Sequence, residues 1–421
     1  MLDIKFIREH AEQVKDAVVK KGVSIDVEEI LNLDSQVKTI RTHVETARRQ
    51  RNQLAAGYAK ASQDERETLS RQSHELSEAL ASEELRLKEL SDQLQALLLL
   101  TPNIPATSSP VGADDSENVV ERREGQPPAF DFTPVDHTEL LRVNSWAELG
   151  DVAHISGSRT FTLKGNLVKY ELALINFALD VLSAEGFTPI TVPPFARESA
   201  LVGTGHFPAG KEDTYALPND DLYLIGTSEV ILNSLHAGQI LNEADLPILY
   251  AGVSQCFRRE AGSGGRDVRG LLRVHHFTKV EQFVICRNDE QESAYWHKRL
   301  LGIAEKILHA LELPYQVIDC CTGDMGLGKV RMNDIETWIP SLDTYRETHS
   351  CSTLHDWQAR RTQTRYRSDG SKDIKLVHTL NNTALATPRI FAALLENHQT
   401  ASGQVKIPKA LQPYMGGQAF L

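Results

Sequence analysis

The chain has 421 residues, 41% of them hydrophobic and 24% charged, which is typical of a globular protein with two or three domains. A formal net charge of −12 argues against non-specific binding to nucleic acid, DNA included, but allows a specific RNA partner that meets a local basic patch. No stretch approaches the roughly 20 apolar residues of a membrane helix. Because Asp3, Glu9 and Glu12 interrupt any apolar leader, we expect a cytoplasmic protein with no membrane partner.

Five cysteines, an odd number with no C-x-x-C pair, suggest neither a disulfide framework nor a paired zinc knuckle. The one local cluster of metal-ligating types is His349, Cys351 and His355. Structural zinc usually takes four ligands, so we interpret this cluster as chance proximity and expect no zinc.

The N-terminal residues predict a short amphipathic helix, because Ile7, Ala11, Val14 and Val18 recur at helical spacing and Gly22 is suited to end the helix. Residues 26–100 then contain no proline and one glycine. Their apolar residues form two series with a repeat near 3.5 residues, which favours supercoiled helices. We predict one antiparallel helical hairpin over about 27–100, with a turn near Ala61–Asp64 and arms about 50 Å long at 1.5 Å per residue.

The first arm of this hairpin carries four arginines that could follow a phosphate backbone: Arg41, Arg48, Arg49 and Arg51. Alternatively, the arginines are a solvated helix face, and the arm acts as a spacer or as a dimerisation element. Contact with RNA through these arginines is therefore one hypothesis among three.

The sequence divides into residues 1–105, a Pro/Ser/Asp-rich linker or extended wrap over 106–134, and a domain over 135–421. In the last part short β-type runs are unevenly interspersed with helical ones, so we predict an α+β fold with an antiparallel or mixed sheet. The predicted strands are FTPITVPPF, LYLIGTSEV, HHFTKVEQFVI and YQVIDC, and the predicted helices KYELALINFALDVLSAEG and AYWHKRLLGIAEKILHALEL.

The most informative segment is residues 257–283, FRREAGSGGRDVRGLLRVHHFTKVEQF. Residues two apart share a strand face, so Arg258 and Glu260 point the same way, as do Arg273, Phe277 and Glu281. Two strands joined by the glycine-rich loop would display these charges around an aromatic ring, which suits a nucleotide. The alternative is an exposed face with ordinary cross-strand ion pairs.

This segment resembles motif 2 of class II aminoacyl-tRNA synthetases, in the form FR-x-EAG-S…RG-LLRVHHF…VEQF of the seryl type. The resemblance implies that Arg258 binds the α-phosphate and the amino-acid carboxylate, and that Glu260 holds the adenine amino group. It further implies that Phe277 stacks on adenine, that Arg273 meets the γ-phosphate, and that Arg259 and the backbone of Val274 line the ATP site.

Two further segments resemble the other class II motifs. FTPITVPPF, with Pro194 as the motif proline, is similar to motif 1 and implies a homodimer. Residues 378–399 resemble motif 3, in which Thr387 would cap a helix with Pro388 at its first position. Arg389 would then bind the γ-phosphate at a helix N-terminus.

The resemblance also implies a serine pocket. Thr227, Ser228 and Glu229 lie in a T-x-E signature, where Thr227 and Glu229 would share a strand face and bind the α-amino group. Glu281 would accept the serine hydroxyl proton and Thr383 would complete that contact. A pocket built to hydrogen-bond a hydroxyl rejects analogues that lack it. The predicted serine-binding residues are Thr227, Ser228, Glu229, Arg258, Glu281, Asn381 and Thr383.

The stretch ETHSCS supplies the implied metal ligands, Glu347 and Ser350, with Thr348 and His349 beside them at the ATP site. A carboxylate with a hydroxyl and phosphate oxygens is a credible Mg²⁺ environment. The chain departs from the family pattern at His349 and at Asn382, which stands where glycine is common. We expect Asn382 to narrow the pocket edge or to need a positive φ, which asparagine tolerates.

The whole chain is therefore similar to a seryl-tRNA synthetase, with an antiparallel-sheet catalytic domain and an N-terminal coiled-coil arm. The implied substrates are ATP, L-serine and tRNA(Ser), with tRNA(Sec) as a further possibility, and Mg²⁺ is the implied cofactor. Arg258, Arg273 and Arg389 would provide catalysis by charge stabilisation. The alternatives are a class II synthetase for another amino acid, a ligase that loads a carrier protein, and a non-enzymatic paralogue.

Overall fold

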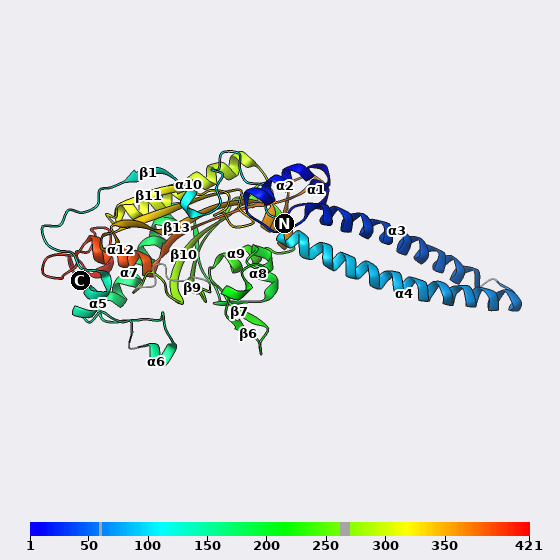
Figure 1. Cartoon of the computed structure of the whole chain (residues 1–421), viewed down its shortest axis with the longest axis horizontal. Coiled ribbons are helices and arrows are strands. Elements are labelled where there is room, and N and C mark those ends of the chain that lie inside the picture. The colour runs from blue at the N-terminus through cyan, green and yellow to red at the C-terminus, as the bar shows by residue number, and fades with distance from the viewer. Residues whose placement is uncertain (59–60, 151, 262–269) are drawn as a thin grey trace. The chain divides into compact units, whose positions relative to one another are not determined.

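The computed structural model describes residues 1–58, 61–150, 152–261 and 270–421 (Figure 1). The chain forms two compact units. The first, which we call the helical unit, consists of Met1–Val19 and Val23–Pro102. The second, which we call the sheet unit, consists of Lys20–Gly22 and Asn103–Leu421. Within the described ranges no helix combines the length and the apolar character needed to cross a membrane.

Two long antiparallel helices dominate the helical unit, α3 (Val27–Tyr58) and α4 (Gln63–Leu100), which lie side by side in Figure 1. Their facing sides bury residues of both predicted apolar series, such as Val37, Val44 and Leu80. The predicted hairpin is thus confirmed. Its turn falls earlier than the expected Ala61–Asp64, because α3 ends at Tyr58 and α4 already begins at Gln63, where the Glu65 carboxylate accepts a hydrogen bond from the backbone of Ser62 (2.9 Å). Residues 59–60 lie outside the described residues.

The N-terminal segment contains two helices where one was predicted, α1 (Ile4–Glu9) and α2 (Ala11–Lys20). The break falls at His10, whose backbone leaves the helical region at φ −132°. Ile7, Val14 and Val18 are nevertheless buried as the periodicity predicted. Gly22 follows α2 with a positive φ of 61°, the left-handed conformation that a side chain would strain.

The sheet unit contains the remaining elements. Its α-helices are α5 (His137–Val143), α6 (Ala153–Ser156), α7 (Asn166–Ala184), α8 (Glu198–Thr204), α9 (Glu229–Ser234), α10 (Glu290–Ala310), α11 (Trp357–Thr362) and α12 (Thr387–Asn397). The strands of the main sheet are β1 (Val119–Glu124), β4 (Thr188–Thr191), β9 (Ile248–Phe257), β10 (His276–Cys286), β11 (Tyr315–Asp319), β12 (Arg331–Ile339), β13 (Thr344–His355) and β16 (His378–Ala386). The strands of the smaller sheets are β2 (Ala147–Glu148), β3 (Thr162–Leu163), β5 (Phe195–Ala196), β6 (Ala216–Leu217), β7 (Leu222–Leu224), β8 (Ile240–Asn242), β14 (Arg365–Arg367) and β15 (Ile374–Leu376).

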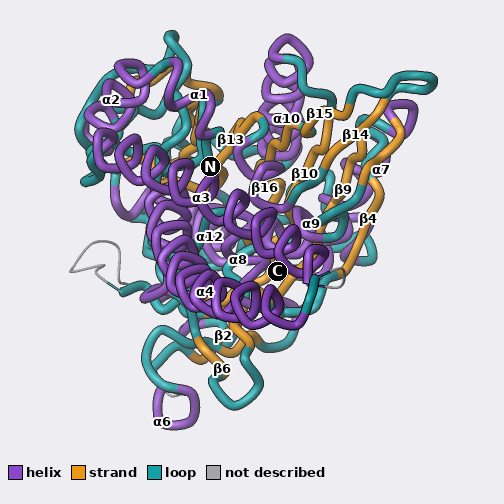
Figure 2. Tube along the Cα trace, turned by 90° about the vertical axis from the view of Figure 1, so that its right-hand side faces the viewer, coloured by secondary structure: helices purple, strands orange, loops and turns teal. Residues whose placement is uncertain are grey.

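The main sheet of the described residues has eight strands in the order β1-β11-β12-β13-β16-β10-β9-β4, part of which is visible in Figure 2. All neighbouring pairs are antiparallel except β4 and β9 at one edge. This confirms the predicted α+β class with an antiparallel sheet. The stretch 106–134 contributes β1, which pairs with β11, so it wraps along the edge of the sheet.

The two faces of the sheet have different roles. One face packs against α7, α10 and α12 in a large apolar core that includes Val280 and Val284 of β10. Because side chains alternate along a strand, Lys279 and Glu281, which flank Val280, point to the opposite face. That opposite face carries the candidate site.

Two local predictions are wrong. The run LYLIGTSEV is a strand only over β7 (Leu222–Leu224), and helix α9 starts at Glu229, so Thr227 and Glu229 do not share a strand face. Thr387 is the first residue of α12 and Ala386 stands at the capping position, without a side-chain cap. A one-residue shift of this kind arises because Pro388 is tolerated anywhere in the first turn.

Candidate active site

The segments before and after the glycine-rich stretch converge at one end of β9 and β10. Arg258 and Glu260 follow directly after β9, and the backbone N–H of Arg258 bonds the carbonyl of His275 (3.0 Å). Arg273 likewise precedes β10. The predicted hairpin therefore exists, but three of its charged residues stand beyond the paired strands, and residues 262–269 lie outside the described residues.

Glu260 adopts a left-handed backbone with φ 52°, which is uncommon for a non-glycine residue. Asp213 holds the flanking backbone: its carbonyl accepts from the N–H of Arg259 (2.9 Å) and its carboxylate accepts from the N–H of Ala261 (2.8 Å). Backbone strain of this kind persists only where the surroundings hold it, which is typical of binding sites. Asp213 has no counterpart in the sequence-based prediction.

Eight of the eleven residues predicted to bind ATP line one cavity: Arg258, Glu260, Arg273, Val274, Phe277, Glu347, Thr348 and Arg389. They come from the ends of β9 and β10, from β13 and from α12. Segments far apart in the sequence thus build one surface with several cations and an aromatic ring. We call it the nucleotide cavity.

The cations of the nucleotide cavity are already engaged within the protein. Arg273 Nη1 lies 3.4 Å from Glu260 Oε2, and Arg389 Nη1 lies 3.2 Å from Glu347 Oε2 and donates to the Glu347 carbonyl (2.7 Å). The Arg258 guanidinium lies over the Phe277 ring, 5.3 Å from its centroid. A polyanionic ligand would exchange these contacts for its own oxygens.

Three predicted ATP residues lie elsewhere. Arg259 is exposed next to the nucleotide cavity and is anchored by its backbone. His349 is buried on the helix-covered side, where Nε2 lies 3.2 Å from the carbonyl of Ala384, and burial lowers the pKa of His349 to about 4. Ser350 lines the neighbouring cavity.

That second cavity, which we call the amino-acid cavity, is lined by six of the seven residues predicted to bind serine: Thr227, Glu229, Arg258, Glu281, Asn381 and Thr383. The exception is Ser228, which is buried with its hydroxyl 3.3 Å from the carbonyl of Gly252. Four residues line both cavities: Arg258, Lys279, Glu347 and Thr383. The two cavities are therefore adjoining parts of one site.

Lys279 lines both cavities and was missed by the sequence analysis. Its ammonium lies 2.5 Å from Glu281 Oε2 and donates to the Thr227 hydroxyl (2.8 Å). Burial raises the pKa of Glu281, and the Lys279 charge opposes this rise. The signal was present, since Lys279 and Glu281 are two apart on a strand and must share a face.

Glu229 is held by two amide groups. Its Oε1 accepts from Gln358 Nε2 (2.7 Å) and from Asn381 Nδ2 (2.8 Å). Gln358 is fully buried and is itself oriented by the hydroxyl of Thr379, which donates to Gln358 Oε1 (2.6 Å). Burial raises the pKa of Glu229, and the Gln358 hydrogen bond acts against this rise. Asn381, predicted to bind serine, thus contacts Glu229 in this structure. Gln358 lies 129 positions from Glu229 in the sequence, so no local pattern indicated their contact.

The predicted metal ligands lie on β13 at the junction of the cavities. Burial acts to raise the pKa of Glu347, but the Arg389 and Arg258 guanidiniums outweigh it and hold the pKa below its ordinary value. Ser350 stands opposite Asp334 of β12. Asp334 was not predicted, and burial together with the charge of Glu347 raises its pKa well above the usual range.

Both departures from the family pattern face the apolar core. Asn382 lies in regular strand β16 and donates to the carbonyl of Leu300 in α10 (2.9 Å), so it neither narrows the pocket nor needs a positive φ. His349 points the same way. The cluster of His349, Cys351 and His355 does not converge, because Cys351 lies against His297 and His355 stacks on His378.

The four arginines of the arm, Arg41, Arg48, Arg49 and Arg51, are all exposed on α3. Arg48 is engaged with Glu84 of α4, with Nη2 2.7 Å from Oε1.

Known proteins share this architecture. Residues 1–105 match the seryl-tRNA synthetase N-terminal domain, and residues 214–398 match the class II tRNA synthetase core domain of the G, H, P, S and T type. The chain is 52% identical to a serine–tRNA ligase of Deinococcus radiodurans over 421 residues, covering 100% of this chain and 99% of that protein. It is 42% identical to the serine–tRNA ligase of Rubrobacter xylanophilus, with 100% and 99% coverage.

Solved structures agree. The seryl-tRNA synthetase of Pyrococcus horikoshii, complexed with ATP, superposes with a TM-score of 0.91 at 39% identity, covering 100% of this chain and 99% of that one. The cytoplasmic serine–tRNA ligase of Naegleria fowleri, in complex with AMP, gives a TM-score of 0.86 at 28% identity, with 100% and 98% coverage. The chain belongs to the seryl-tRNA synthetase family of class II aminoacyl-tRNA ligases.

Proposed function

We propose that this chain activates L-serine with ATP and transfers it to the 3′ end of tRNA(Ser). In the first step an oxygen of the serine carboxylate attacks the α-phosphorus in line, forming seryl-adenylate and displacing pyrophosphate. In the second step the terminal ribose hydroxyl of the tRNA attacks the acyl carbon, loses its proton and releases AMP. Neither step needs a covalent bond to the protein.

The observation that carries this proposal is the sharing of Arg258 between the two cavities. A guanidinium at that junction can meet the serine carboxylate and the α-phosphate together, which are the two groups that must react. Holding them in contact supplies much of the rate through positioning, and the positive charge stabilises the crowded oxygens around phosphorus.

The outer part of the nucleotide cavity suits the rest of ATP. Phe277 offers a ring face for adenine and Glu260 an acceptor for its amino group. Arg273 and Arg389 would leave Glu260 and Glu347 to bind the β- and γ-phosphates. Because these resting ion pairs are partly solvent-exposed, breaking them costs little compared with the charge-assisted bonds to phosphate.

The amino-acid cavity suits serine at both ends. Glu229 and the Thr227 hydroxyl would bind the ammonium group, and Glu281 with Thr383 would bind the side-chain hydroxyl. The charge of Lys279 opposes the rise in the pKa of Glu281 that burial causes, and so favours the ionised carboxylate. Alanine would leave the buried Glu281 without the hydroxyl that it binds, so it is rejected by chemistry and larger side chains are rejected by size.

Mg²⁺ is the proposed cofactor. Glu347 and Ser350 provide oxygen donors beside the arginines that would bind phosphate, which fits a cation that keeps waters and phosphate oxygens in its shell. The cation would neutralise negative charge on the polyphosphate. Glu347 must release Arg389 to bind it, so the same carboxylate holds the arginine in the absence of ligand.

The tRNA is proposed to bind the arm at about 27–100, within an N-terminal domain of residues 1–105, with 106–134 as a wrap and 135–421 as the catalytic domain. The exposed Arg41, Arg48, Arg49 and Arg51 support contact with a phosphate backbone, which reads shape more than base sequence. We also propose a cytoplasmic homodimer that pairs through the motif 1 region. Charging of tRNA(Sec) is an additional activity to test with that tRNA.

The direct test is amino-acid-dependent exchange of labelled pyrophosphate into ATP, with all twenty amino acids, followed by charging of tRNA(Ser). We expect exchange with serine and a strong loss in Glu281→Ala. Exchange with a different amino acid would overturn the proposed substrate, and absence of exchange with all twenty in folded protein would overturn the activity.

A further inference from the structure

A buried histidine and a buried glutamate meet outside the residues assigned above. His137, the first residue of α5, is 2% exposed, and Glu396 of α12 is 0% exposed. His137 Nδ1 lies 2.6 Å from Glu396 Oε1, which also accepts a hydrogen bond from the backbone N–H of His137 (3.0 Å). The other oxygen of Glu396 accepts from the backbone N–H of Ser341 (2.8 Å). Groups of the protein thus satisfy this buried carboxylate and leave the second imidazole nitrogen for another contact.

The second nitrogen of His137 fixes the position of the proton on the ring. The backbone N–H of Leu271 lies 3.1 Å from His137 Nε2. Because a backbone amide can only donate, Nε2 must offer its lone pair, and the proton of the neutral imidazole lies on Nδ1, facing Glu396. Glu396 therefore stabilises the tautomer in which His137 can hold the Leu271 backbone.

The Leu271 backbone belongs to the wall of the nucleotide cavity, which Leu271, Leu272 and Arg273 line in sequence. Arg389 Nε donates to the carbonyl of Leu272 (3.2 Å). Two backbone groups that directly precede Arg273, the N–H of Leu271 and the carbonyl of Leu272, are therefore held by side chains. These two bonds determine the point from which the Arg273 side chain extends.

The backbone before Leu271 fits closely against the imidazole. Gly270 has a positive φ of 62°, and a Cβ at this position would lie 2.2 Å from His137 Nε2 and 2.4 Å from Thr138 Cγ2. A side chain has no room there, so glycine allows the chain to approach the ring closely enough for the hydrogen bond from Leu271.

We propose that His137 is a positioning residue for ATP, because its Nε2 holds the Leu271 backbone and its Nδ1 joins that backbone to Glu396. Glu396 and Arg389 lie on the same helix, α12. The link therefore sets the position of Arg273 relative to Arg389. These are the guanidiniums proposed for the β- and γ-phosphates, so the inference rests on the proposed function. Cations that are held in place beforehand need little reorganisation when the polyphosphate binds.

Two substitutions separate the two nitrogens of the ring. In His137→Asn the amide nitrogen can take the place of Nδ1 and donate to Glu396, but no acceptor reaches Leu271. In His137→Gln the longer side chain can place its amide oxygen at the position of Nε2 and accept from Leu271. We expect His137→Asn to raise the KM for ATP about tenfold in pyrophosphate exchange with little change in the KM for serine, and His137→Gln to recover most of this loss.

The matched control is His297→Asn, which also truncates a buried imidazole with both nitrogens engaged, one by Thr353 (2.9 Å) and one by Asn333 (2.8 Å). Thermal melting should show lower stability for this variant, while its KM for ATP stays normal. If the KM for ATP followed the melting temperature across all three variants, His137 would be structural and the proposal would be overturned.

The contact itself is measured without substrate, by amide hydrogen exchange at Leu271. We expect this amide to exchange at least tenfold faster in His137→Asn than in the wild type, and close to the wild-type rate in His137→Gln. Equal protection in the wild type and His137→Asn would overturn the proposal. Because this measurement needs no ATP or serine, its failure is distinct from a failure of the proposed function, which wild-type pyrophosphate exchange decides.

Discussion

Replacing Gln358 by leucine tests how the ammonium group of serine is held. Gln358 donates one of the two amide hydrogen bonds to Glu229 Oε1, at 2.7 Å, and contacts neither proposed substrate itself. A hydrogen bond to a charged group is worth about 1.5–3 kcal/mol. Since about 1.4 kcal/mol is a factor of ten, kcat/KM for serine should fall about tenfold to a hundredfold.

The assay is steady-state pyrophosphate exchange with serine varied at saturating ATP, and then the reverse. The KM for serine should rise while the KM for ATP changes little, because Glu229 lies in the amino-acid cavity alone. Gln358 favours the ionised form of Glu229, so its loss raises the pKa of Glu229 further. The acid limb of kcat/KM for serine should therefore move to higher pH.

The matched control is Gln282→Leu, which also removes a fully buried amide, but on the face of β10 that packs against α10. Both variants should lose stability, and only Gln358→Leu should lose serine affinity selectively. If the two variants had the same kinetics, Gln358 would be structural. In a Glu229→Gln background the Gln358 effect should largely disappear, and full additivity would refute action through Glu229.

Four further predictions follow from the same geometry. Glu281→Gln should lower kcat/KM for serine in exchange about tenfold to a hundredfold, and an unchanged value would remove Glu281 from hydroxyl recognition. Lys279→Met leaves Glu281 buried without its cation, so the unfolding free energy measured in denaturant titrations should drop by about 3–5 kcal/mol. Adding Glu281→Gln should restore much of this stability, and no recovery would contradict the pairing of Lys279 with Glu281. The double variant Arg41→Ala, Arg49→Ala should raise the KM for tRNA and reduce the slope of log affinity for tRNA against log salt concentration by about 1–2. Serine-dependent pyrophosphate exchange should stay normal. Equal losses in both assays would count against a role of these arginines in tRNA binding alone. Burial lowers the pKa of His297 from 6.5 to about 4, so its stabilising contribution is present above pH 6.5 and is lost as the pH falls toward 4. Between pH 7 and pH 5, His297→Gln should therefore lose about 1–2 kcal/mol less stability than the wild type. Parallel curves of stability against pH for the two proteins would show that His297 does not cause this loss.

The fold class and much of the site were predictable because their signals are local. The arm follows from an apolar repeat that any supercoiled pair must satisfy, and it lies at α3 and α4 as expected. The residues around motif 2 are close in sequence, and the antiparallel pairing of β9 with β10 brings Arg258 and Phe277 into one cavity. When two strands that are neighbours in the sequence pair with each other, few other arrangements of their residues are open.

Errors came where tertiary contacts override local pattern. The run LYLIGTSEV has strand-forming residues, but the chain turns after β7 and Glu229 opens α9, where it reaches Gln358 and Asn381. Asn382 and His349 were expected near the pocket, but β16 directs Asn382 to the carbonyl of Leu300 in α10, and β13 directs His349 to the carbonyl of Ala384 in β16. The alternation of a strand decides such orientations only once its register is known.

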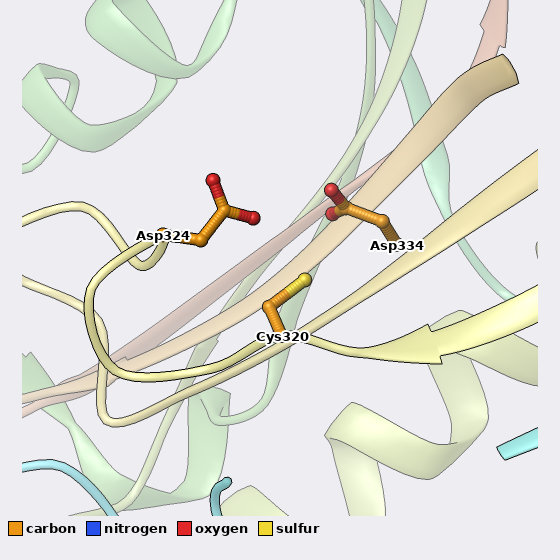
Figure 3. Close-up of side chains that lie close together, drawn as sticks. All are labelled: Cys320, Asp324 and Asp334. Carbon is orange, nitrogen blue, oxygen red and sulfur yellow. The ribbon is translucent and has the colours of Figure 1, made fainter. Parts of the chain in front are cut away.

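The sequence by itself determined the class of fold, the helical arm and the identity of the charged and aromatic residues around the nucleotide cavity, because periodicity and short motifs encode them locally. Only the tertiary structure decided that Lys279 pairs with Glu281, that Gln358 holds Glu229, and that Asp334 meets Asp324 and Cys320 (Figure 3). The physical reason is that these groups are buried. A buried charge must find a partner wherever the fold places one, and that partner can lie more than a hundred residues away.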